Sequence, residues 1–519
     1  MDFVAKLSTG TVEFINVCGI ENKDFSVVQK SSISAEILYK KKTLVTIKED
    51  EIIVNRRCTH QIFVTYAEGR QLVISSSLSA LLNVKKNKVY LNLRYLIDYI
   101  YKGPQPRSDT AFEGIYYISP GGKWLPNVQH ALIEPLVDTQ TNIFEALHEH
   151  LERSVPPDSI AGLEYSGGLE STVLLHILKK MKFKRLKLYH LTDSMSGETD
   201  DLDRVKRSAD DNQVELEILD YGSSSPFRSA LSSELKPSFP HPGLVNTEYL
   251  DYTTRLTKCD NVTFINGSGG DSLFCAHPQK ALPYELLCNC RFIQASRSVI
   301  NLSEYFRRSL IKTIISSRKQ YRELKSKLTE HDSVINSYSE VFNSDNLKLH
   351  SPEKTHNIFQ VNRSLCYNSR LINAQTNRFE MLTNPSSNGS GKYLYPFLCY
   401  ESLAAAMAVP DTNLLKGKLD RYYLRKLSHE RFNDSNLLST RKGGVGGLTQ
   451  RAFRENKIQI LGVLLNGPLG EKNLINNEFI SAIVEGVAIG AIACPTYIVN
   501  LFSLNIFIRY WDDVHHGIR

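Results

Sequence analysis

The sequence of 519 residues has no long apolar run and no basic, apolar segment at its start. Because the first residues, MDFVAKLSTGTVEF, do not read as a secretory signal, we expect a cytoplasmic protein. The most apolar stretch, Phe479 to Phe502, contains Glu485, Pro495 and Asn500, which are unfavourable inside a bilayer. We therefore expect a buried pair of helices there and no membrane span.

Cysteine spacings typical of metal or redox sites and blocks of like charge are also missing. The nine cysteines are scattered, and the one close pair, Cys288 and Cys290, has a one-residue gap that suits neither a zinc site nor a redox dithiol. The net charge is +7, but the 62 basic residues are mixed with 55 acidic ones. This mixing argues against a nucleic-acid partner and fits a mildly basic site for phosphates.

What is present is the composition of an ordered globular protein, and the order of its expected strands and helices predicts the α/β class. At this length two domains are expected, because one hydrophobic core rarely grows so large. Residues 1–138 contain short β-branched runs, such as 43–47 and 61–66, and predict stacked antiparallel sheets. Asn142 is a candidate N-cap for a helix at the start of the second unit, residues 139–519.

In the second unit buried strands alternate with helices. Strands are expected at 160–165, 185–191, 214–219 and 262–266, with helices at 172–180 and 201–212. This alternation predicts a parallel sheet that binds its ligands at the carboxyl ends of the strands. After about residue 280 the pattern becomes mainly helical, and residues 305–350 are rich in charge, which predicts a solvated helix or lid.

A glycine pair stands where the first of these strands runs into a helix, in the run Tyr165-Ser166-Gly167-Gly168-Leu169-Glu170-Ser171. Adjacent glycines permit left-handed conformations and a close approach to a ligand, so that consecutive N–H groups can point at phosphate oxygens. The following helix adds the positive end of its dipole. The run has no Gly-Lys-Ser/Thr and is not a Walker loop. A plain turn is the alternative.

A second glycine-rich turn follows another buried strand and ends in a carboxylate, in the run Asn266-Gly267-Ser268-Gly269-Gly270-Asp271. At the mouth of the sheet Asp271 would suit Mg²⁺, which bridges phosphates and neutralises their charge. The alternative is a solvated Asp271 that caps the next helix, and the two roles are compatible.

Together, SGGLES and GSGGDSLF resemble the SGGLDS and GxGxDELF pair of the asparagine synthetase B superfamily, which includes β-lactam synthetase and the lasso peptide cyclases. Further segments resemble other elements of the superfamily in the same order: 112–121, 199–205, 395–398 and 440–444. The resemblance extends from about residue 110 to residue 447.

The resemblance implies a degenerate, glutaminase-like Ntn-hydrolase domain over 1–138 and a synthetase domain of the PP-loop ATP pyrophosphatase type over 139–519. It implies ATP and Mg²⁺ as cofactors and cleavage of ATP to AMP and pyrophosphate. Glu170 and Asp271 would be metal ligands, and Asp271 and Lys442 would be catalytic. The residues assigned to ATP and pyrophosphate are Ser166, Gly167, Gly168, Leu169, Glu170, Ser171, Gly267, Ser268, Gly269 and Gly270.

Three positions depart from the superfamily pattern. Asp2 stands where glutamine-dependent members have a cysteine nucleophile, so we expect that glutamine is not the nitrogen source. Glu170 replaces the usual aspartate and is one methylene longer, which predicts a shifted or water-bridged metal contact. Ser268 replaces the Glu of asparagine synthetases and the Tyr of β-lactam synthetases, which favours a different pair of reactants.

Within the superfamily the chain is most similar to lasso peptide cyclases, which keep a degenerate N-terminal half and a GxGGD run. This similarity implies macrolactam formation in a leader-freed core peptide, with a leader peptidase as partner. The enzyme would adenylate an Asp or Glu side chain, and the N-terminal amine of the peptide would displace AMP. The alternatives are a β-lactam-type amide synthetase, an ammonia-dependent asparagine synthetase and a pseudo-enzyme that only binds nucleotide.

Lys442 precedes a run of glycines, where a solvated loop residue is the ordinary interpretation. The similarity to the RxKxG segment of the superfamily instead implies a lysine that reaches the reacting centre. An ammonium group fixed where negative charge develops would stabilise the transition state.

Overall fold

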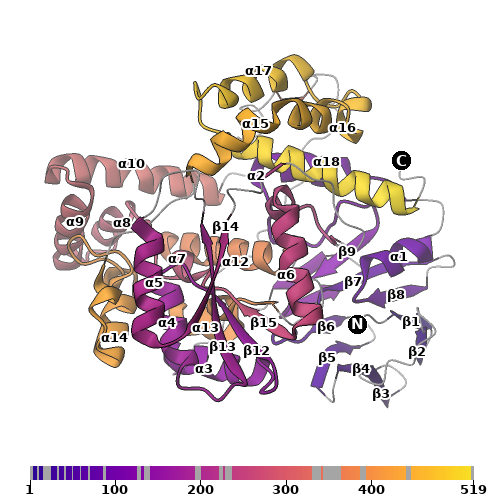
Figure 1. Ribbon diagram of the computed structural model, residues 1–519, viewed down its shortest axis with the longest axis horizontal. Helices are drawn as coiled ribbons and strands as arrows, with labels where there is room; N and C mark the ends of the chain where they lie inside the picture. Colours follow the sequence, from indigo (N-terminus) through magenta and orange to yellow (C-terminus); the bar gives the residue numbers. More distant parts are fainter. Residues whose placement is uncertain are drawn as a thin grey trace.

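The computed structural model of the chain is shown in Figure 1. It describes residues 4–515 apart from 9–10, 16–24, 32–33, 40–41, 49–50, 59, 68–70, 86–88, 126–129, 134–140, 193–199, 221–225, 228–236, 330–340, 343–363, 386–392 and 440–445. Within these residues the strands form three sheets, two antiparallel and one parallel.

The N-terminal part consists of the two antiparallel sheets. The first has the strand order β2 (Thr11–Ile15), β1 (Val4–Ser8), β8 (Leu72–Ser75), β7 (Ile62–Tyr66) and β9 (Ile115–Ile118). The second has the order β11 (His130–Ile133), β10 (Gly122–Leu125), β6 (Ile52–Val54), β5 (Lys42–Ile47), β4 (Ser34–Tyr39) and β3 (Phe25–Ser31). The predicted strands at 43–47 and 61–66 are confirmed.

The two antiparallel sheets pack face to face. Ile62 and Ile74 of the first sheet share one buried cluster with Ile37, Val45 and Trp124 of the second. Because side chains alternate between the two faces of a strand, the β-branched residues of these strands meet in the layer between the sheets. The prediction of stacked antiparallel sheets is confirmed.

The third sheet is parallel throughout its described strands. Its order is β14 (Glu215–Asp220), β13 (Arg185–Thr192), β12 (Ile160–Glu164), β15 (Val262–Ile265) and β16 (Tyr393–Leu394). Helices α4 (Leu169–Leu178) and α5 (Asp200–Asn212) lie on one side of it and α6 (Thr247–Cys259) on the other (Figure 1). The predicted alternation of strands and helices is therefore confirmed, and β12 lies in the middle of the sheet.

The helix that leads into this sheet, α3 (Ile143–Ser154), begins as the sequence predicts. The side chain of Asn142 accepts hydrogen bonds from the backbone N–H groups of Phe144 and Glu145, and the carboxylate of Glu145 accepts one from the backbone N–H of Asn142, which makes a capping box. The N-terminal part also contains the helices α1 (Leu78–Lys85) and α2 (Leu93–Lys102). Both end in a lysine, and the side chain of Asn92 caps the start of α2.

The remainder is mainly helical, as predicted. Its helices are α7 (Gly270–Leu273), α8 (Leu282–Cys288), α9 (Phe292–Phe306), α10 (Leu310–Thr329), α12 (Leu365–Leu382), α13 (Tyr400–Met407), α14 (Tyr422–Phe432), α15 (Gly446–Leu465), α16 (Pro468–Glu471), α17 (Asn477–Ala488) and α18 (Thr496–His515). The predicted helix pair over Phe479 to Phe502 corresponds to α17 and the start of α18. Among the described residues, no helix combines the length and apolar character needed to cross a bilayer.

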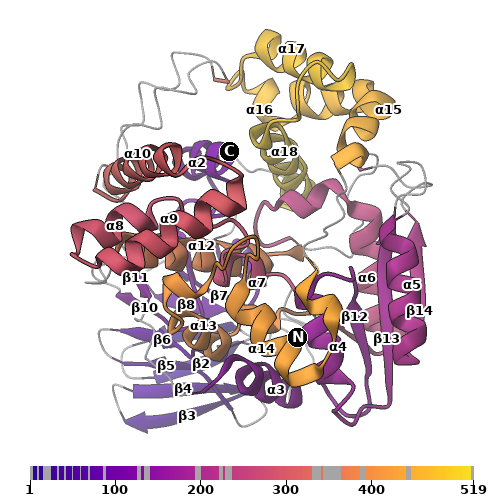
Figure 2. The ribbon, with the colours of Figure 1, turned by 90° about the vertical axis from the view of Figure 1, so that its left-hand side faces the viewer.

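The C-terminal helix α18 packs on the N-terminal part of the chain (Figure 2). Phe112, which precedes β9, contacts Phe507 and Trp511 with ring centroids 5.7 and 6.5 Å apart. The amide of Asn500 donates to the carbonyl of Ile100 in α2 at 3.0 Å. The last helix and the first sheet therefore share one core.

We expect Trp511→Ala to destabilise the whole chain through this shared core. Trp511 is 1% exposed, and its indole N–H donates to the carbonyl of Pro237 at 2.8 Å. Loss of a buried Trp side chain costs about 3–5 kcal/mol of unfolding free energy. Denaturant unfolding of Ile458→Ala, a change at an 84% exposed position, is the matched control. Equal unfolding midpoints for the two variants would contradict the packing described.

Candidate active site

The first glycine turn lies at the carboxyl end of β12. Gly167 has a φ of +67°, a conformation that favours glycine, and Gly168 is the N-cap residue of α4. No described side chain caps α4, so its first N–H groups can face an anionic ligand. The hydroxyls of Ser166 and Ser171 lie 3.3 Å apart at the same place.

Leu169 contributes to this turn through its backbone only. Its side chain is 6% exposed and belongs to the cluster that packs α3 and α4 against the parallel sheet. The sequence-based assignment of Leu169 to ligand binding therefore applies to its N–H group. The apolar side chain anchors the turn to the core.

The second glycine turn touches the first. It follows β15, the neighbour of β12, with Leu163 and Ile265 paired in register. A methyl group on Gly270 would lie 2.3 Å from Cγ of Glu170, and one on Gly267 would lie 3.0 Å from Cβ of Glu170. Glycine is therefore required in the second turn because the side chain of Glu170 lies over it.

The middle of the second turn is held by its surroundings. Gly269 has a φ of +104°, and a methyl group there would lie 2.4 Å from Leu398, which follows β16. The backbone N–H of Ser268 donates to the side-chain oxygen of Asn266 at 2.6 Å. The turn therefore has one conformation set by β15 and by the segment at Leu398.

The two acidic residues that the sequence singles out are brought together by an arginine. Nη1 of Arg421 donates to Oε1 of Glu170 at 2.7 Å and also to Oδ1 of Asp271. Arg421 precedes α14, and its Nε donates to Asp420 at 2.9 Å. The other oxygen of Asp420 accepts from Arg425 at 3.0 Å. Asp420 thus holds Nε of Arg421, while Nη1 reaches the carboxylates of both turns.

Burial and charge oppose each other at this cluster. Burial raises the pKa of Glu170, Arg421 acts against that effect, and the neighbouring Asp271 adds to it. For Arg421 burial lowers the pKa, but Glu170, Asp420 and Asp271 outweigh burial, so the net direction is upward. The guanidinium therefore stays charged, and it is the group that allows two carboxylates to stand side by side.

A second buried carboxylate forms the floor beneath the turns. Glu164, the last residue of β12, accepts hydrogen bonds from the hydroxyls of Tyr249 and Tyr393 and from the amide of Asn266. Burial raises the pKa of Glu164, and the three donors oppose this shift. Since Asn266 also holds the N–H of Ser268, this network links β12 to the second turn.

Arg421 and Glu164 were not identified in the sequence. Glu164 is the last residue of an otherwise apolar strand, and a charged residue there is a signal that could have been used. Arg421 lies among other charged residues of a helical segment, and no local pattern distinguishes it. Lys442, which the sequence assigns to catalysis, and Asp2 lie outside the described residues.

For a Mg²⁺ ion at this site the described residues offer two ligands, the carboxylates of Glu170 and Asp271. Clusters of three or more His, Cys, Asp or Glu side chains suited to a metal are not found in the part of the chain that the structure describes. Mg²⁺ commonly binds through one or two carboxylates together with substrate phosphates. Glu170 and Asp271 fit this donor set when phosphate is present and Arg421 has moved from between them.

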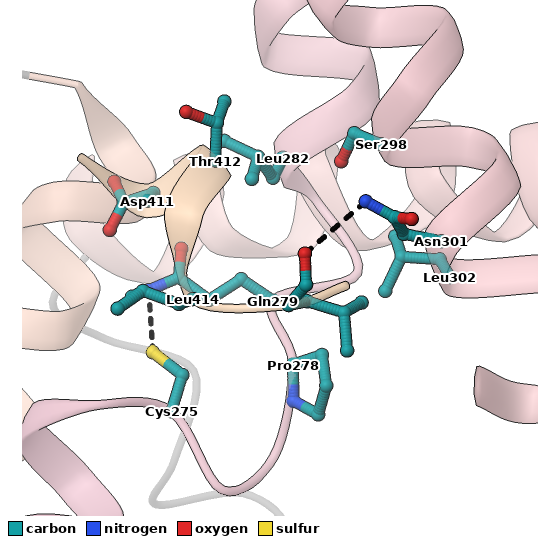
Figure 3. Close-up of a pocket in the computed structure, with 11 residues that line it drawn as sticks. Cys275, Pro278, Gln279, Leu282, Ser298, Asn301, Leu302, Asp411, Thr412 and Leu414 are labelled. Atoms are coloured by element: carbon teal, nitrogen blue, oxygen red, sulfur yellow. Dashed lines mark hydrogen bonds between the residues drawn. The ribbon is translucent and has the colours of Figure 1, made fainter. Parts of the chain in front are cut away.

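A separate cavity lies beyond α7, between α9 and the segment that contains Asp411 and Leu414 (Figure 3). Gln279 crosses it and donates to the sulfur of Cys275 at 3.6 Å, and Asn301 donates to the carbonyl of Leu415 at 3.2 Å. None of its lining residues belongs to either glycine turn. These two hydrogen bonds join the walls of the cavity to each other, which is typical of packing.

The sequence of the chain matches the family model described as asparagine synthase over residues 142–507, more than half of the chain. The chain belongs to the asparagine synthase family. The superfamily resemblance seen in the sequence is thereby confirmed at the level of the family.

Comparisons of the whole chain add little to this assignment. The curated proteins give no match. Among solved structures, the chain is similar to a glutamine-dependent NAD+ synthetase from Acinetobacter baumannii in complex with adenosine diphosphate. The identity is 12%, the match covers 47% of this chain and 59% of that chain, and the TM-score is 0.17. The chain thus matches less than two thirds of that protein, and this likeness carries no argument about the site.

The contact between the two turns of this asparagine synthase family member predicts the effect of a single methyl group. Gly270→Ala should cost about 1–3 kcal/mol of unfolding free energy, because the methyl group overlaps Glu170. In a Glu170→Ala background, where Cγ is absent, the cost should be smaller. A double-mutant cycle measured by denaturant unfolding gives this difference.

Gly462→Ala is the matched control for this cycle. A methyl group on Gly462, in α15, meets nothing within 4 Å, so the change should be neutral or slightly stabilising. If Gly270→Ala costs the same with and without the side chain of Glu170, the close contact between the turns is wrong.

Proposed function

We propose that the chain activates a carboxylate as an acyl-adenylate and passes the acyl group to an amine. A carboxylate oxygen attacks the α-phosphorus of ATP, the bond between the α- and β-phosphates breaks, and pyrophosphate leaves. The amine then attacks the acyl carbon, AMP leaves, and an amide bond forms. AMP and pyrophosphate are the products.

One observation carries this proposal: two glycine turns from adjacent parallel strands meet at one edge, each with a carboxylate beside Arg421. The N-terminus of α4 gives consecutive N–H groups for phosphate oxygens, and Arg421 adds a cation at the same place. Such a site suits the charge of a departing pyrophosphate. A Walker lysine, which would point to transfer of the terminal phosphate, is missing from the sequence.

Glu170 and Asp271 would hold Mg²⁺ when ATP is bound, and the ion would neutralise charge on the phosphates. Although the side chain of Glu170 is longer than that of aspartate, its carboxylate still lies in the site, because Arg421 forms an ion pair with both Glu170 and Asp271. This sharing favours a working enzyme over a pseudo-enzyme that only binds nucleotide. Arg421 would then turn from the carboxylates toward the phosphates.

The proposed substrate is a leader-freed core peptide, as in the lasso peptide cyclases. An Asp or Glu side chain of the peptide would be adenylated, and its N-terminal amine would close a macrolactam ring. The similarity of the GSGGD run to those cyclases supports this choice, and the stacked N-terminal sheets are compatible with a degenerate glutaminase-like domain. A leader peptidase is the proposed partner. Small-molecule amide synthesis and ammonia-dependent asparagine synthesis are the alternatives, and substrate trials separate them.

The products of ATP test the reaction class. With an accepted peptide, the wild-type chain should release AMP and pyrophosphate in equal amounts with the cyclic product. Asp271→Ala should lose this release and keep its fold, because the Asp271 side chain is 45% exposed. Asp203→Ala, an exposed change in α5, is the control. ADP and orthophosphate as the main products would contradict the proposal.

Lys442 is proposed to serve the chemical step. If its ammonium meets charge that develops as the adenylate forms or collapses, Lys442→Ala should lower the maximal rate by about 10²- to 10³-fold with nearly unchanged substrate affinity. Lys442→Arg should restore part of the rate, because the charge stays and its geometry changes. Single-turnover cyclisation by Lys442→Ala at the wild-type rate would show that Lys442 is a solvated loop residue.

A further inference from the structure

A second cavity lies between the N-terminal sheets and the parallel-sheet half of the chain, and it is distinct from the nucleotide site. It has a volume of about 100 Å³. Its walls come from the segment after β6, the end of α3, the helix α12 and the start of α13. No residue of the two glycine turns lines it.

Positive charge predominates in the lining of this cavity. The charged residues that line it are Arg56, Arg57, Arg153, Arg378 and Glu401, four cations against one anion. His150 also lines it, and burial lowers the pKa of His150 to about 4, so this side chain is uncharged at neutral pH. The cavity is therefore suited to an anion.

The single carboxylate among these residues is already engaged. Nε of Arg57 lies 2.5 Å from Oε1 of Glu401, and Nη2 of Arg153 lies 3.6 Å from the same oxygen. Arg56 donates to the hydroxyl of Tyr400 at 3.1 Å and lies over its ring. Glu401 thus balances the two arginines at the rim, one of which, Arg57, has a side chain that is 59% exposed.

Arg378 is the cation that remains. It is 6% exposed, and its Nη1 donates to the carbonyl of Pro120 at 3.3 Å. The charge of Glu401 acts on Arg378 from a distance, but among the described residues no carboxylate lies within ion-pair distance of it, and its buried Nε has no hydrogen-bond partner. A buried charge without a counter-ion is costly, and proteins pair such groups. The missing partner can be supplied by a ligand.

We propose that this cavity, the arginine cavity, binds a small oxyanion, a carboxylate or phosphate group that pairs with Arg378. A planar guanidinium matches the two oxygens of either group. Arg153 lies close enough to the cavity to contribute a second contact by turning from Glu401. Leu398, which packs over Gly269, also lines the arginine cavity. Only the side chain of Leu398 would therefore separate the ligand from the second glycine turn.

The test uses the thermal midpoint of the full chain, titrated with sodium phosphate or sodium succinate at constant ionic strength set by sodium chloride. Either anion should raise the wild-type midpoint above the chloride baseline, and the stronger of the two identifies the preferred class. In Arg378→Met the apparent affinity for that anion should fall about tenfold or more, as expected for loss of a charged hydrogen bond.

Two controls separate the arginine cavity from the nucleotide site. Arg318→Met, a change at an exposed position of α10, should respond to the anions as the wild type does. Arg378→Met should keep the full stabilisation by ATP, which shows that the fold and the glycine turns are intact. If Arg378→Met does not fold, Arg153→Gln at the rim should show the weakened anion response instead.

Three outcomes would overturn the proposal. The first is no response of the wild type to phosphate or succinate beyond that to chloride. The second is an anion response that persists unchanged in Arg378→Met, because the anion would then bind elsewhere. The third applies where Arg153→Gln replaces Arg378→Met, and is an unchanged anion response in Arg153→Gln.

Discussion

The site depends on the pairing of β12 and β15 as direct neighbours in a parallel sheet. Because both strands end at the same edge, the two glycine turns that follow them come into van der Waals contact. Glu170 of the first turn fills the space that a side chain at Gly270 would need. One glycine turn alone would be an ordinary strand-to-helix connection, and the contact between two of them creates a cradle for phosphate.

That contact also creates an electrostatic difficulty, which Arg421 resolves. Glu170 loses hydration by burial and lies beside the negative charge of Asp271, and both effects raise the pKa of Glu170. The guanidinium of Arg421 lies between Glu170 and Asp271 and is itself held by Asp420. The site therefore contains a cation before nucleotide arrives, and anionic phosphates meet a charge distribution that is already in place.

Much of this architecture could be predicted from the sequence because its signals are local. Alternating apolar runs predict the strands and helices of the parallel sheet, and the capping residue Asn142 predicts the start of α3. The glycines and carboxylates of both turns are visible because backbone conformation and charge restrict the residue types there.

The remainder depends on long-range packing, which leaves no local signal. Arg421 reaches Glu170 across 251 positions of the chain. Helix α18 packs on the first sheet through Phe112 and Trp511, and a periodicity analysis shows only that such a helix is apolar. The arginine cavity is likewise assembled from four separate segments. The role of Lys442 and the choice of a peptide substrate stay predictions.

In the proposed reaction a substrate carboxylate attacks the α-phosphorus of ATP at this site. The most direct measurement follows a heavy-oxygen label placed in the carboxylate of an accepted substrate, with the products separated and weighed by mass spectrometry. An acyl-adenylate leaves one labelled oxygen in AMP when the amine takes the acyl group, and we expect this labelled AMP. Label in orthophosphate, with unlabelled ADP beside it, would show an acyl-phosphate and contradict the account.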